Sequence, residues 1–364
     1  MKKLGIKIWT RDVVKNRNFF EQAVAAVKNK DFDYLELFVF PNSYNDTAEV
    51  IRRELKGCPT IIHNSHSAYG FDAGDADCLA GNLRDVGDSQ KFADMLNAEI
   101  IIVHAGCGCE ERHLEETIRQ FKRFDDKRIA VENMPASCSV SGKALHGVFP
   151  EQIERIMSET GCKFCLDFSH ATCAANYYGR RVGKILEDFA ALKPDMYHLC
   201  DGMADEVQDK HLHFGEGNYD LAHMVNDIVA EDAYVTMETG YKPPVDINPW
   251  LDDRDYLRKI CGYENKMHLI AVVLVVYIVF AEWRGINQQR KIGELQRTVS
   301  KLREDKTVWY EAVLPEAAEE CLFEEKNGTL VLARLSDKRW QKKDGSVDFE
   351  AIKRWAYLKD IKNL

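Results

Sequence analysis

Metal-capable side chains end six of the short apolar runs in this sequence of 364 residues. The six are His63, His104, Glu132, Asp167, His198 and Glu238. Imidazole and carboxylate groups at such positions suit zinc or manganese. Because a random scatter of the eleven histidines would not favour the ends of apolar runs so consistently, the pattern predicts that these side chains share one site.

Three further candidate ligands follow these runs closely. His170 stands three residues after Asp167, about one helical turn away. Asp209 and His211 are two residues apart, so both side chains face the same way in an extended loop. Nine ligands are too many for one four- or five-coordinate ion and suit three ions that share a carboxylate. Glu132 is the candidate for sharing and for a catalytic role, since a carboxylate can bridge two cations.

The apolar runs alternate with stretches of helical length, which is the βαβα pattern of a parallel sheet. Strands are expected at 4–9, 32–38, 60–63, 99–104, 128–132, 164–167, 196–199 and 233–238. Helices are expected near 14–29, 46–56, 81–97, 110–124, 149–160, 182–192, 219–230 and 251–261. Eight strands and eight helices in alternation predict a closed (β/α)8 TIM barrel over residues 1–262, with an open doubly wound sheet as the alternative. In a barrel the strand ends converge on one face, where barrel enzymes hold their active sites.

Charge and cysteine content constrain the class of protein. The formal net charge of −10 gives no overall basic field for nucleic acid, although an excess of acid suits a site for several cations. The eleven cysteines have no repeated spacing, and the N-terminus carries no apolar run of signal-peptide length, so we expect free thiols and a cytoplasmic barrel. Two close cysteine pairs, Cys107 with Cys109 and Cys162 with Cys165, are interpreted as structural thiols.

The chain changes character after residue 262. Residues 267–281 carry no charge and Trp283 follows as an interfacial anchor, so we expect a hydrophobic helix over 263–285 that inserts marginally into a membrane. A buried helix is the alternative. Membrane contact through 267–283 would tether the barrel.

Two further segments are predicted after this hydrophobic helix. Apolar residues at 3-4-3 spacing predict a short coiled coil over 286–306, although two heptads are weak support for one. A small α+β domain of unknown function is expected over 307–364, with a strand at 328–334 and an amphipathic helix near 348–359.

The motifs of the first 262 residues together resemble those of a known family. They are His63, His104-Ala105-Gly106, Glu132-Asn133, Asp167-Phe168-Ser169-His170, His198-Leu199-Cys200-Asp201, Asp209-Lys210-His211, Gly215-Glu216-Gly217-Asn218 and Glu238-Thr239. This set resembles endonuclease IV, the family-2 apurinic/apyrimidinic endonucleases of the xylose-isomerase-like TIM barrel superfamily. The resemblance implies a hydrolase of base-excision repair that incises DNA at abasic sites and holds three zinc ions, with manganese as a substitute.

The resemblance also implies how the ligands are shared out. It places the first zinc on His63, His104 and Glu132. It places the second on Glu132, Asp167, His198 and Glu238, and the third on His170, Asp209 and His211. In that family the bridged pair supplies a hydroxide that attacks phosphorus, and the remaining ion steadies charge on the leaving 3′ oxygen. Closely spaced cations suit such an in-line displacement.

One departure from the family, a set of basic residues and one alternative function remain to be named. The family inserts an aromatic side chain into DNA from the loop after the third strand, where this chain has His66, with Tyr69 nearby. The candidate residues for contacts with the phosphates of a DNA backbone are Arg11, Lys15, Arg17, Arg180 and Arg181. The alternative is a sugar or sugar-phosphate isomerase or epimerase of the superfamily, which needs one metal on Glu132, Asp167, His198 and Glu238 and works by acid and base. Such an enzyme has little use for the other five ligands.

Overall fold

The structure is a computed structural model of the whole chain. It describes residues 2–240 and 244–261 in full, and the backbone of five later strands. The chain divides into two compact units, Met1–Cys261 and Gly262–Leu364.

The first unit is a closed barrel of eight parallel strands, so the predicted TIM barrel is confirmed and the open sheet is not formed. The strands are β1 (Lys3–Trp9), β2 (Tyr34–Phe38), β3 (Thr60–His63), β4 (Ile101–His104), β5 (Ile129–Glu132), β6 (Lys163–Asp167), β7 (Met196–Leu199) and β8 (Tyr234–Met237). Closure comes from the pairing of β1 with β8, in which Lys3 to Ile6 lie opposite Tyr234 to Met237.

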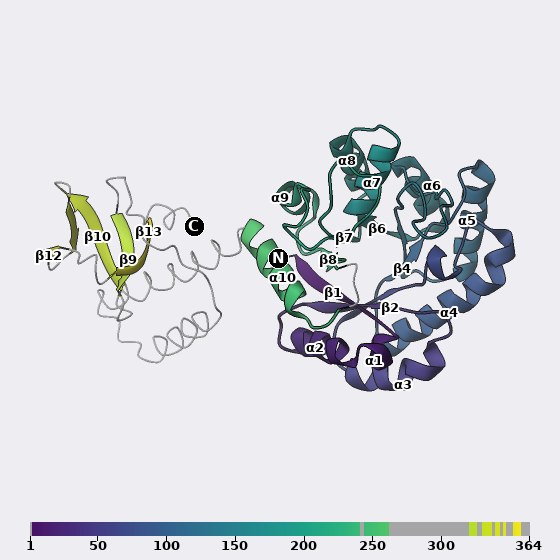
Figure 1. Ribbon diagram of the computed structural model, residues 1–364, viewed down its shortest axis with the longest axis horizontal. Coiled ribbons are helices and arrows are strands. Elements are labelled where there is room, and N and C mark those ends of the chain that lie inside the picture. Colours follow the sequence, from purple (N-terminus) through teal and green to yellow (C-terminus); the bar gives the residue numbers. More distant parts are fainter. Residues whose placement is uncertain are drawn as a thin grey trace. The chain divides into compact units, whose positions relative to one another are not determined.

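Helices surround the strands, as Figure 1 shows. They are α1 (Asp12–Lys15), α2 (Arg17–Lys28), α3 (Tyr44–Glu54), α4 (Leu79–Leu96), α5 (Glu111–Phe124), α6 (Pro150–Thr160), α7 (Phe168–Tyr177), α8 (Val182–Ala191), α9 (Leu221–His223) and α10 (Asn248–Ile260). Short turns of helix lie at η1 (Ser67–Tyr69), η2 (Ala76–Cys78) and η3 (Met224–Ile228). The sequence pattern did not predict α7, which begins directly at the end of β6 and is almost entirely buried.

Two apolar cores hold the barrel. The larger packs the helices against the outer face of the strands. The smaller fills the barrel interior with Tyr34, Ile61, Ile100, Ile102, Ala130, Cys165 and Met196. Because successive side chains of a strand point to opposite faces, the interior set comes from alternate positions and leaves the strand ends for polar groups.

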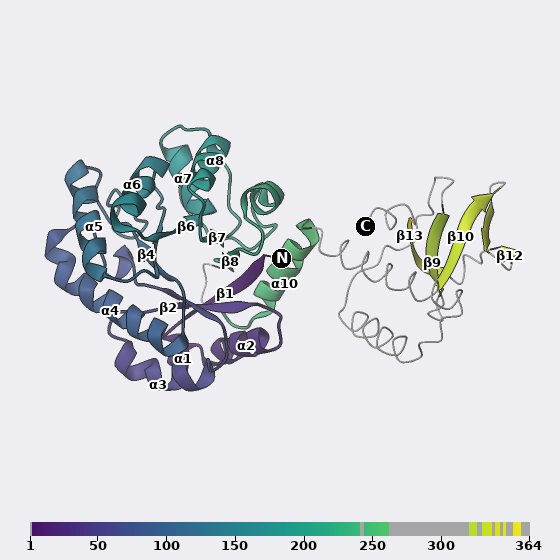
Figure 2. The same ribbon diagram turned by 180° about the vertical axis from the view of Figure 1, so that it is seen from behind.

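The second unit contains a five-stranded antiparallel sheet in the order β12-β11-β10-β9-β13 (Figure 2). The strands are β9 (Glu320–Glu325), β10 (Leu330–Ser336), β11 (Arg339–Lys342), β12 (Gly345–Ser346) and β13 (Ile352–Tyr357). The strand expected at 328–334 is present as β10. The helix expected near 348–359 is wrong, because β13 pairs with β9 there. So short a segment fits both the helical and the strand period, and the partner strand decides between them.

The hydrophobic helix predicted over 263–285 and the coiled coil predicted over 286–306 lie outside the described residues. Within the part of the chain that is described, no helix is long and apolar enough to cross a membrane.

Candidate metal centre

The strand register brings the predicted ligands to one end of the barrel. His104 lies opposite Glu132 across β4 and β5, and Asp167 lies opposite His198 across β6 and β7. Glu238 directly follows β8. Glu132, Asp167 and His198 are almost completely buried, whereas His104 and Glu238 keep a small exposed surface. The parallel ladder thus places imidazoles and carboxylates of neighbouring strands side by side at the carboxyl ends.

Glu132 lies at the centre of the cluster. Its Oε2 is 3.3 Å from Nε2 of His63 and 3.2 Å from Nε2 of His104. Its Oε1 is 3.2 Å from Nδ1 of His198 and 3.3 Å from Nδ1 of His170. The two oxygens of one carboxylate therefore face two different groups of imidazoles, which is the arrangement that a shared ligand requires.

The second group of donors surrounds Nδ1 of His198. This atom is 3.0 Å from Oε1 of Glu238 and 3.9 Å from Oδ2 of Asp167, in addition to its contact with Glu132. Asp167 also caps α7, because its Oδ1 accepts the backbone N–H of His170 at 2.7 Å. The capping bond fixes the spacing between this carboxylate and the next imidazole.

The third group lies around Asp209. Its Oδ2 is 2.7 Å from Nε2 of His211 and 3.5 Å from Nε2 of His170. Cys200 lies close enough for its sulfur to belong to the same group of donor atoms as Asp209 and His211. All nine residues singled out in the sequence thus lie in one continuous cluster.

Backbone carbonyls orient three of the imidazoles. Nδ1 of His63 lies 2.7 Å from the carbonyl of Asn64, Nδ1 of His170 lies 2.9 Å from that of Asn133, and Nδ1 of His211 lies 2.7 Å from that of Glu238. A carbonyl only accepts, so Nδ1 carries a proton in each ring, and Nε2 presents a lone pair when the ring is neutral. That tautomer suits a metal ion bound at Nε2.

The cluster fits bound cations. Nδ1 of His63 bonds a carbonyl, so a lone pair on Nε2 of this ring faces Oε2 of Glu132, and lone pairs repel one another unless a proton or metal ion lies between them. Among the described residues, Oε2 of Glu132 is one of only three buried side-chain polar atoms without a hydrogen-bond partner. An unsatisfied buried carboxylate oxygen is costly, so the donor set is suited to zinc or manganese.

Burial and charge shift the ionisation of the cluster. Burial, together with the negative charges of Asp209 and Glu132, raises the pKa of Asp167 to about 7. Burial opposes protonation of His211, but Asp209 outweighs it and raises the pKa of His211 to about 9. Burial likewise opposes ionisation of Glu132, but His198 and His104 hold its pKa well below the usual range. These shifts describe a site crowded with negative charge, which is suited to cations.

Two charged residues of the cluster were not identified from the sequence. Lys7 and Glu36 lie inside β1 and β2, and Nζ of Lys7 forms ion pairs with Glu36 at 3.1 Å and with Glu238. Each interrupts an apolar run, as Ile6-Lys7-Ile8 and Leu35-Glu36-Leu37. A charge inside a buried strand is the signal that would have revealed them, since barrel strands are covered on both faces.

The Gly215-Glu216-Gly217-Asn218 motif is held by Asp201 rather than pointing into the cluster. The Asp201 carboxylate accepts backbone N–H bonds from Gly202, Gly215, Gly217 and Tyr219 at 2.8–3.2 Å. A Cβ at Gly217 would overlap the carbonyl oxygen of Gly202, so the close approach requires glycine. The motif therefore shapes the loop next to Asp209.

An aromatic wall borders the cluster on the side of β1 to β3. His66 does not protrude: its ring stacks on His104 with centroids 5.2 Å apart, and burial lowers its pKa. Tyr69 is 39 % exposed and packs on Phe40 at 4.7 Å. Phe40 in turn packs on Trp9 at 5.6 Å. We call Trp9, Phe38, Phe40 and Tyr69 the aromatic wall.

The predicted basic residues lie in different surroundings. Arg11 stacks on Trp9 of the aromatic wall, with its guanidinium carbon 3.8 Å from the ring centroid. Lys15 and Arg181 are exposed, and Arg180 lies over the ring of Phe149 at 5.0 Å. Arg17 is neutralised by two glutamates, Glu21 and Glu54. Of the five predicted basic residues, Arg11 is therefore the one that stacks on the aromatic wall.

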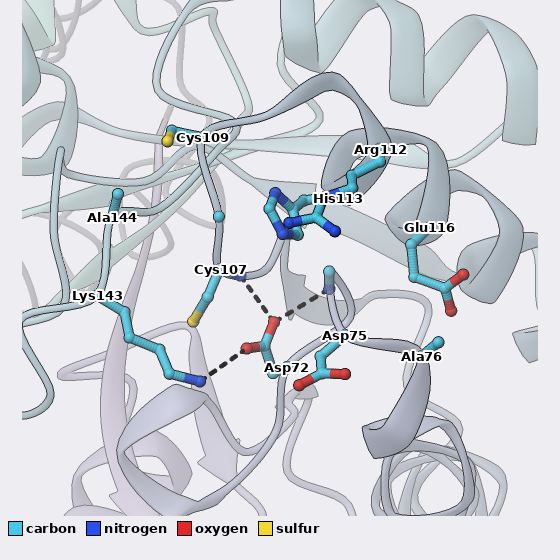
Figure 3. Close-up of a pocket in the computed structure, with 12 residues that line it drawn as sticks. Asp72, Asp75, Ala76, Cys107, Cys109, Arg112, His113, Glu116, Lys143 and Ala144 are labelled. Carbon is cyan, nitrogen blue, oxygen red and sulfur yellow. Dashed lines mark hydrogen bonds and ion pairs between the residues drawn. The ribbon is translucent and has the colours of Figure 1, made fainter.

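A separate cavity of about 550 Å³ lies beside α5 (Figure 3). At its base Asp72 accepts the backbone N–H bonds of Cys107 and Gly74, at 2.8 and 3.1 Å, and pairs with Lys143. Cys107 is buried and Cys109 is exposed. None of the nine predicted ligands lines this cavity.

The fold and the cluster define a (β/α)8 barrel with grouped imidazole and carboxylate donors at the carboxyl ends of its strands. The chain belongs to the family described as xylose isomerase-like TIM barrel, whose model matches residues 24–260. A probable endonuclease 4 of Mycobacterium ulcerans (strain Agy99) is 25% identical over 150 residues, which cover 40% of this chain and 59% of that protein. The chain thus spans little more than half the length of this curated relative.

Solved structures share the fold. A D-tagatose 3-epimerase-like protein superposes with a TM-score of 0.54 and 16% identity, covering 72% of this chain and 98% of the other. An L-ribulose 3-epimerase gives a TM-score of 0.54 and 16% identity, covering 74% and 98%. At these identities the likeness concerns the barrel alone.

Proposed function

We propose that the barrel is a metal-dependent phosphodiester hydrolase that incises DNA at abasic sites. The observation that carries the proposal is the complete donor set. Five donors, His63, His104, His170, Asp209 and His211, stand beside the four that a single ion would use. In the proposed assignment, His63, His104 and Glu132 hold one zinc, Glu132, Asp167, His198 and Glu238 a second, and His170, Asp209 and His211 a third. Bound zinc ions would supply a nucleophile at neutral pH and stabilise the charge on both oxygens of an in-line displacement.

The chain's own residues hold the metal centre and contact the substrate. The backbone-held imidazoles keep their Nε2 atoms aimed into the cluster, and Glu132 joins two of the donor groups. The aromatic wall offers ring surfaces to a sugar or base, and Arg11 offers a positive charge to a phosphate. Stacking on such rings tolerates any base, which suits a site that reads damage rather than sequence.

The alternative sugar isomerase or epimerase would need only Glu132, Asp167, His198 and Glu238. In that enzyme the remaining five donors would have no use, although three of them, His63, His170 and His211, are oriented by backbone carbonyls. Orienting a buried imidazole by a backbone hydrogen bond is typical of metal ligands. The full set therefore favours the hydrolase.

The test uses the full chain loaded with zinc, and separately with manganese. It is incubated with duplex DNA carrying one abasic site, with the intact duplex, and with a panel of ketoses. We expect cleavage on the 5′ side of the abasic sugar that leaves a 3′ hydroxyl and stops on strong chelation. Glu132→Gln should abolish it, whereas Glu231→Gln, an exposed carboxylate just before β8, should not. Ketose turnover without incision by fully loaded protein would replace the proposal with the isomerase.

A further inference from the structure

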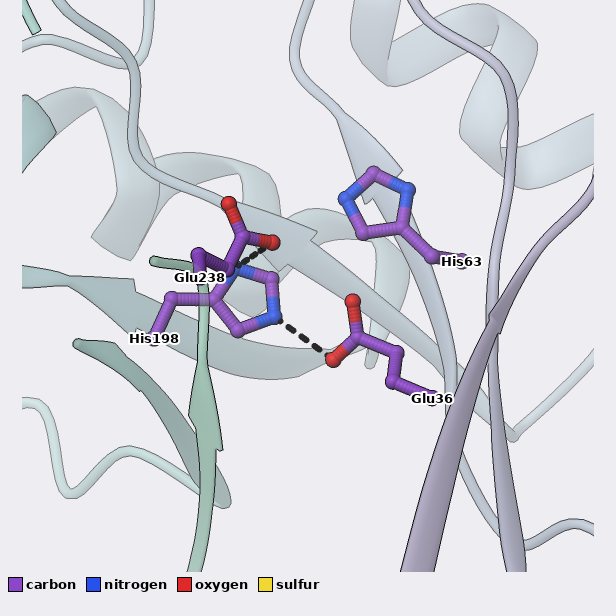
Figure 4. A group of neighbouring side chains, drawn as sticks. All are labelled: Glu36, His63, His198 and Glu238. Carbon is purple, nitrogen blue, oxygen red and sulfur yellow. Dashed lines mark hydrogen bonds and ion pairs between the residues drawn. The ribbon is translucent and has the colours of Figure 1, made fainter. Parts of the chain in front are cut away.

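Glu36, His63, His198 and Glu238 form a fourth group of donors, drawn in Figure 4. Each offers an atom within 4.8 Å of the others. A cation already balances the negative charge of this group, because the ammonium of Lys7 contacts both Glu36 and Glu238. The lysine takes the place that a further metal ion would need, so the role of Glu36 must be sought in its other contacts.

Glu36 makes its closest contact to a predicted ligand with His198. Its Oε2 accepts from Nε2 of His198 at 2.9 Å, and both side chains are fully buried. The His198 ring is therefore turned round relative to His63, His170 and His211. Those rings bond a carbonyl through Nδ1 and present Nε2, whereas His198 bonds Glu36 through Nε2 and presents Nδ1 to the cluster.

The position of His198 explains why it needs a carboxylate partner. It lies within β7, before the last residue of the strand, and is paired with Thr236 of β8 and with Asp167 of β6. The backbone carbonyls there belong to the parallel ladders. His63, at the end of its strand, and His211, in a loop, have carbonyls to bond. A side chain reaching across the barrel supplies what the backbone cannot.

Glu36 is itself held firmly. Its Oε2 also accepts from Oγ1 of Thr236 at 2.6 Å. Oγ1 of Thr236 lies 2.8 Å from the hydroxyl of Tyr34, which must donate because the threonine proton is already used. Glu36, Thr236 and Tyr34 have no exposed surface. These hydrogen bonds fix the Glu36 carboxylate in one orientation.

We infer that Glu36 is a positioning residue of the proposed metal centre, which fixes the ring of His198 so that Nδ1 faces the cluster. Lys7 balances the charge that Glu36 brings into the barrel. Carboxylate partners of this kind orient a ligating imidazole and increase its basicity, and their loss typically costs 10–100-fold in metal affinity. The inference rests on the metal centre of the proposed function but not on its substrate.

The experiment compares zinc affinity, by competition with a chelating indicator, in the full-length wild type and three variants. Glu36→Leu removes the acceptor, and we expect a 10–100-fold rise in the zinc Kd of the weakened site. Glu36→Gln keeps an oxygen that can accept from Nε2, so we expect a smaller loss. Asp12→Asn is the control, since Asp12 is similarly buried but accepts only from Trp9 and Asn16. The zinc affinity of Asp12→Asn should match that of the wild type.

A second readout reports the ring of His198 directly. In zinc-loaded protein labelled with ¹⁵N-histidine, we expect a slowly exchanging Nε2 proton on His198 in the wild type and Asp12→Asn, and its loss in Glu36→Leu. Equal zinc affinity in wild type and Glu36→Leu, with the Nε2 proton retained, would overturn the inference and leave the metal centre standing. A wild type that takes up no zinc would overturn both. Circular dichroism checks that each variant is folded.

Discussion

Replacing Glu132 with glutamine tests the shared ligand most directly. The substitution keeps the shape of the side chain and removes one charge from between two groups of donors. In the proposed assignment Glu132 is the only carboxylate ligand of the ion on His63 and His104, whereas Asp167 and Glu238 remain around His198 after the change. We therefore expect one ion to be lost and a second to be weakened.

The size of the effect follows from the separation of the charges. Two unit charges about 4 Å apart interact by about 4 kcal/mol at an effective dielectric constant of 20. At about 1.4 kcal/mol per factor of ten, losing that interaction weakens binding by roughly a thousandfold. An ion that depends on Glu132 for its only negative ligand should then dissociate during purification.

The assay is elemental analysis of protein purified without chelator, compared with the variant His211→Ala. The wild type should hold about three zinc or manganese ions per chain. Glu132→Gln should lose more than one, whereas His211→Ala should lose one, since His211 contacts only the group around Asp209 and the edge of Glu238. A loss of one ion from both variants would refute the shared role of Glu132. Both variants should stay folded, because the core of the barrel is apolar.

Three further predictions follow from the site. Zinc affinity should rise with pH between 6 and 9, by about tenfold per pH unit for each proton displaced. The reason is that the pKa of His211 is raised to about 9, so this ring is protonated in metal-free protein below that value. A zinc affinity independent of pH, measured by indicator competition, would contradict this prediction. Gly217→Ala should destabilise the barrel by about 1–3 kcal/mol, since its Cβ would overlap the carbonyl oxygen of Gly202; an unchanged midpoint in urea would show that the loop adapts. Arg11→Ala should raise KM for abasic DNA and flatten its salt dependence without lowering the metal content, whereas an unchanged salt slope would exclude a phosphate contact.

Local pattern was enough to predict the strands of the barrel and most of its helices. The end of β3 at His63, of β4 at His104, of β5 at Glu132 and of β6 at Asp167 coincides with the predicted ends. Apolar runs of four to seven residues alternating with amphipathic stretches admit few folds, because each element must bury its apolar face. The nine candidate ligands were visible for the same reason, since a polar residue closing an apolar run is a local signal.

Tertiary structure decided what local pattern leaves open. The strand β13 was mistaken for a helix because its own residues do not show that it pairs with β9. Lys7 and Glu36 stand out in the sequence as charges inside apolar runs, but the sequence does not show which groups they contact. Only closure of the barrel through β1 and β8 brings them to His198 and Glu238. Sequence determined which groups could bind metal. The orientation of four of the imidazoles, through a carbonyl or through Glu36, depends on partners up to 162 residues away along the chain, and only the folded barrel joins them.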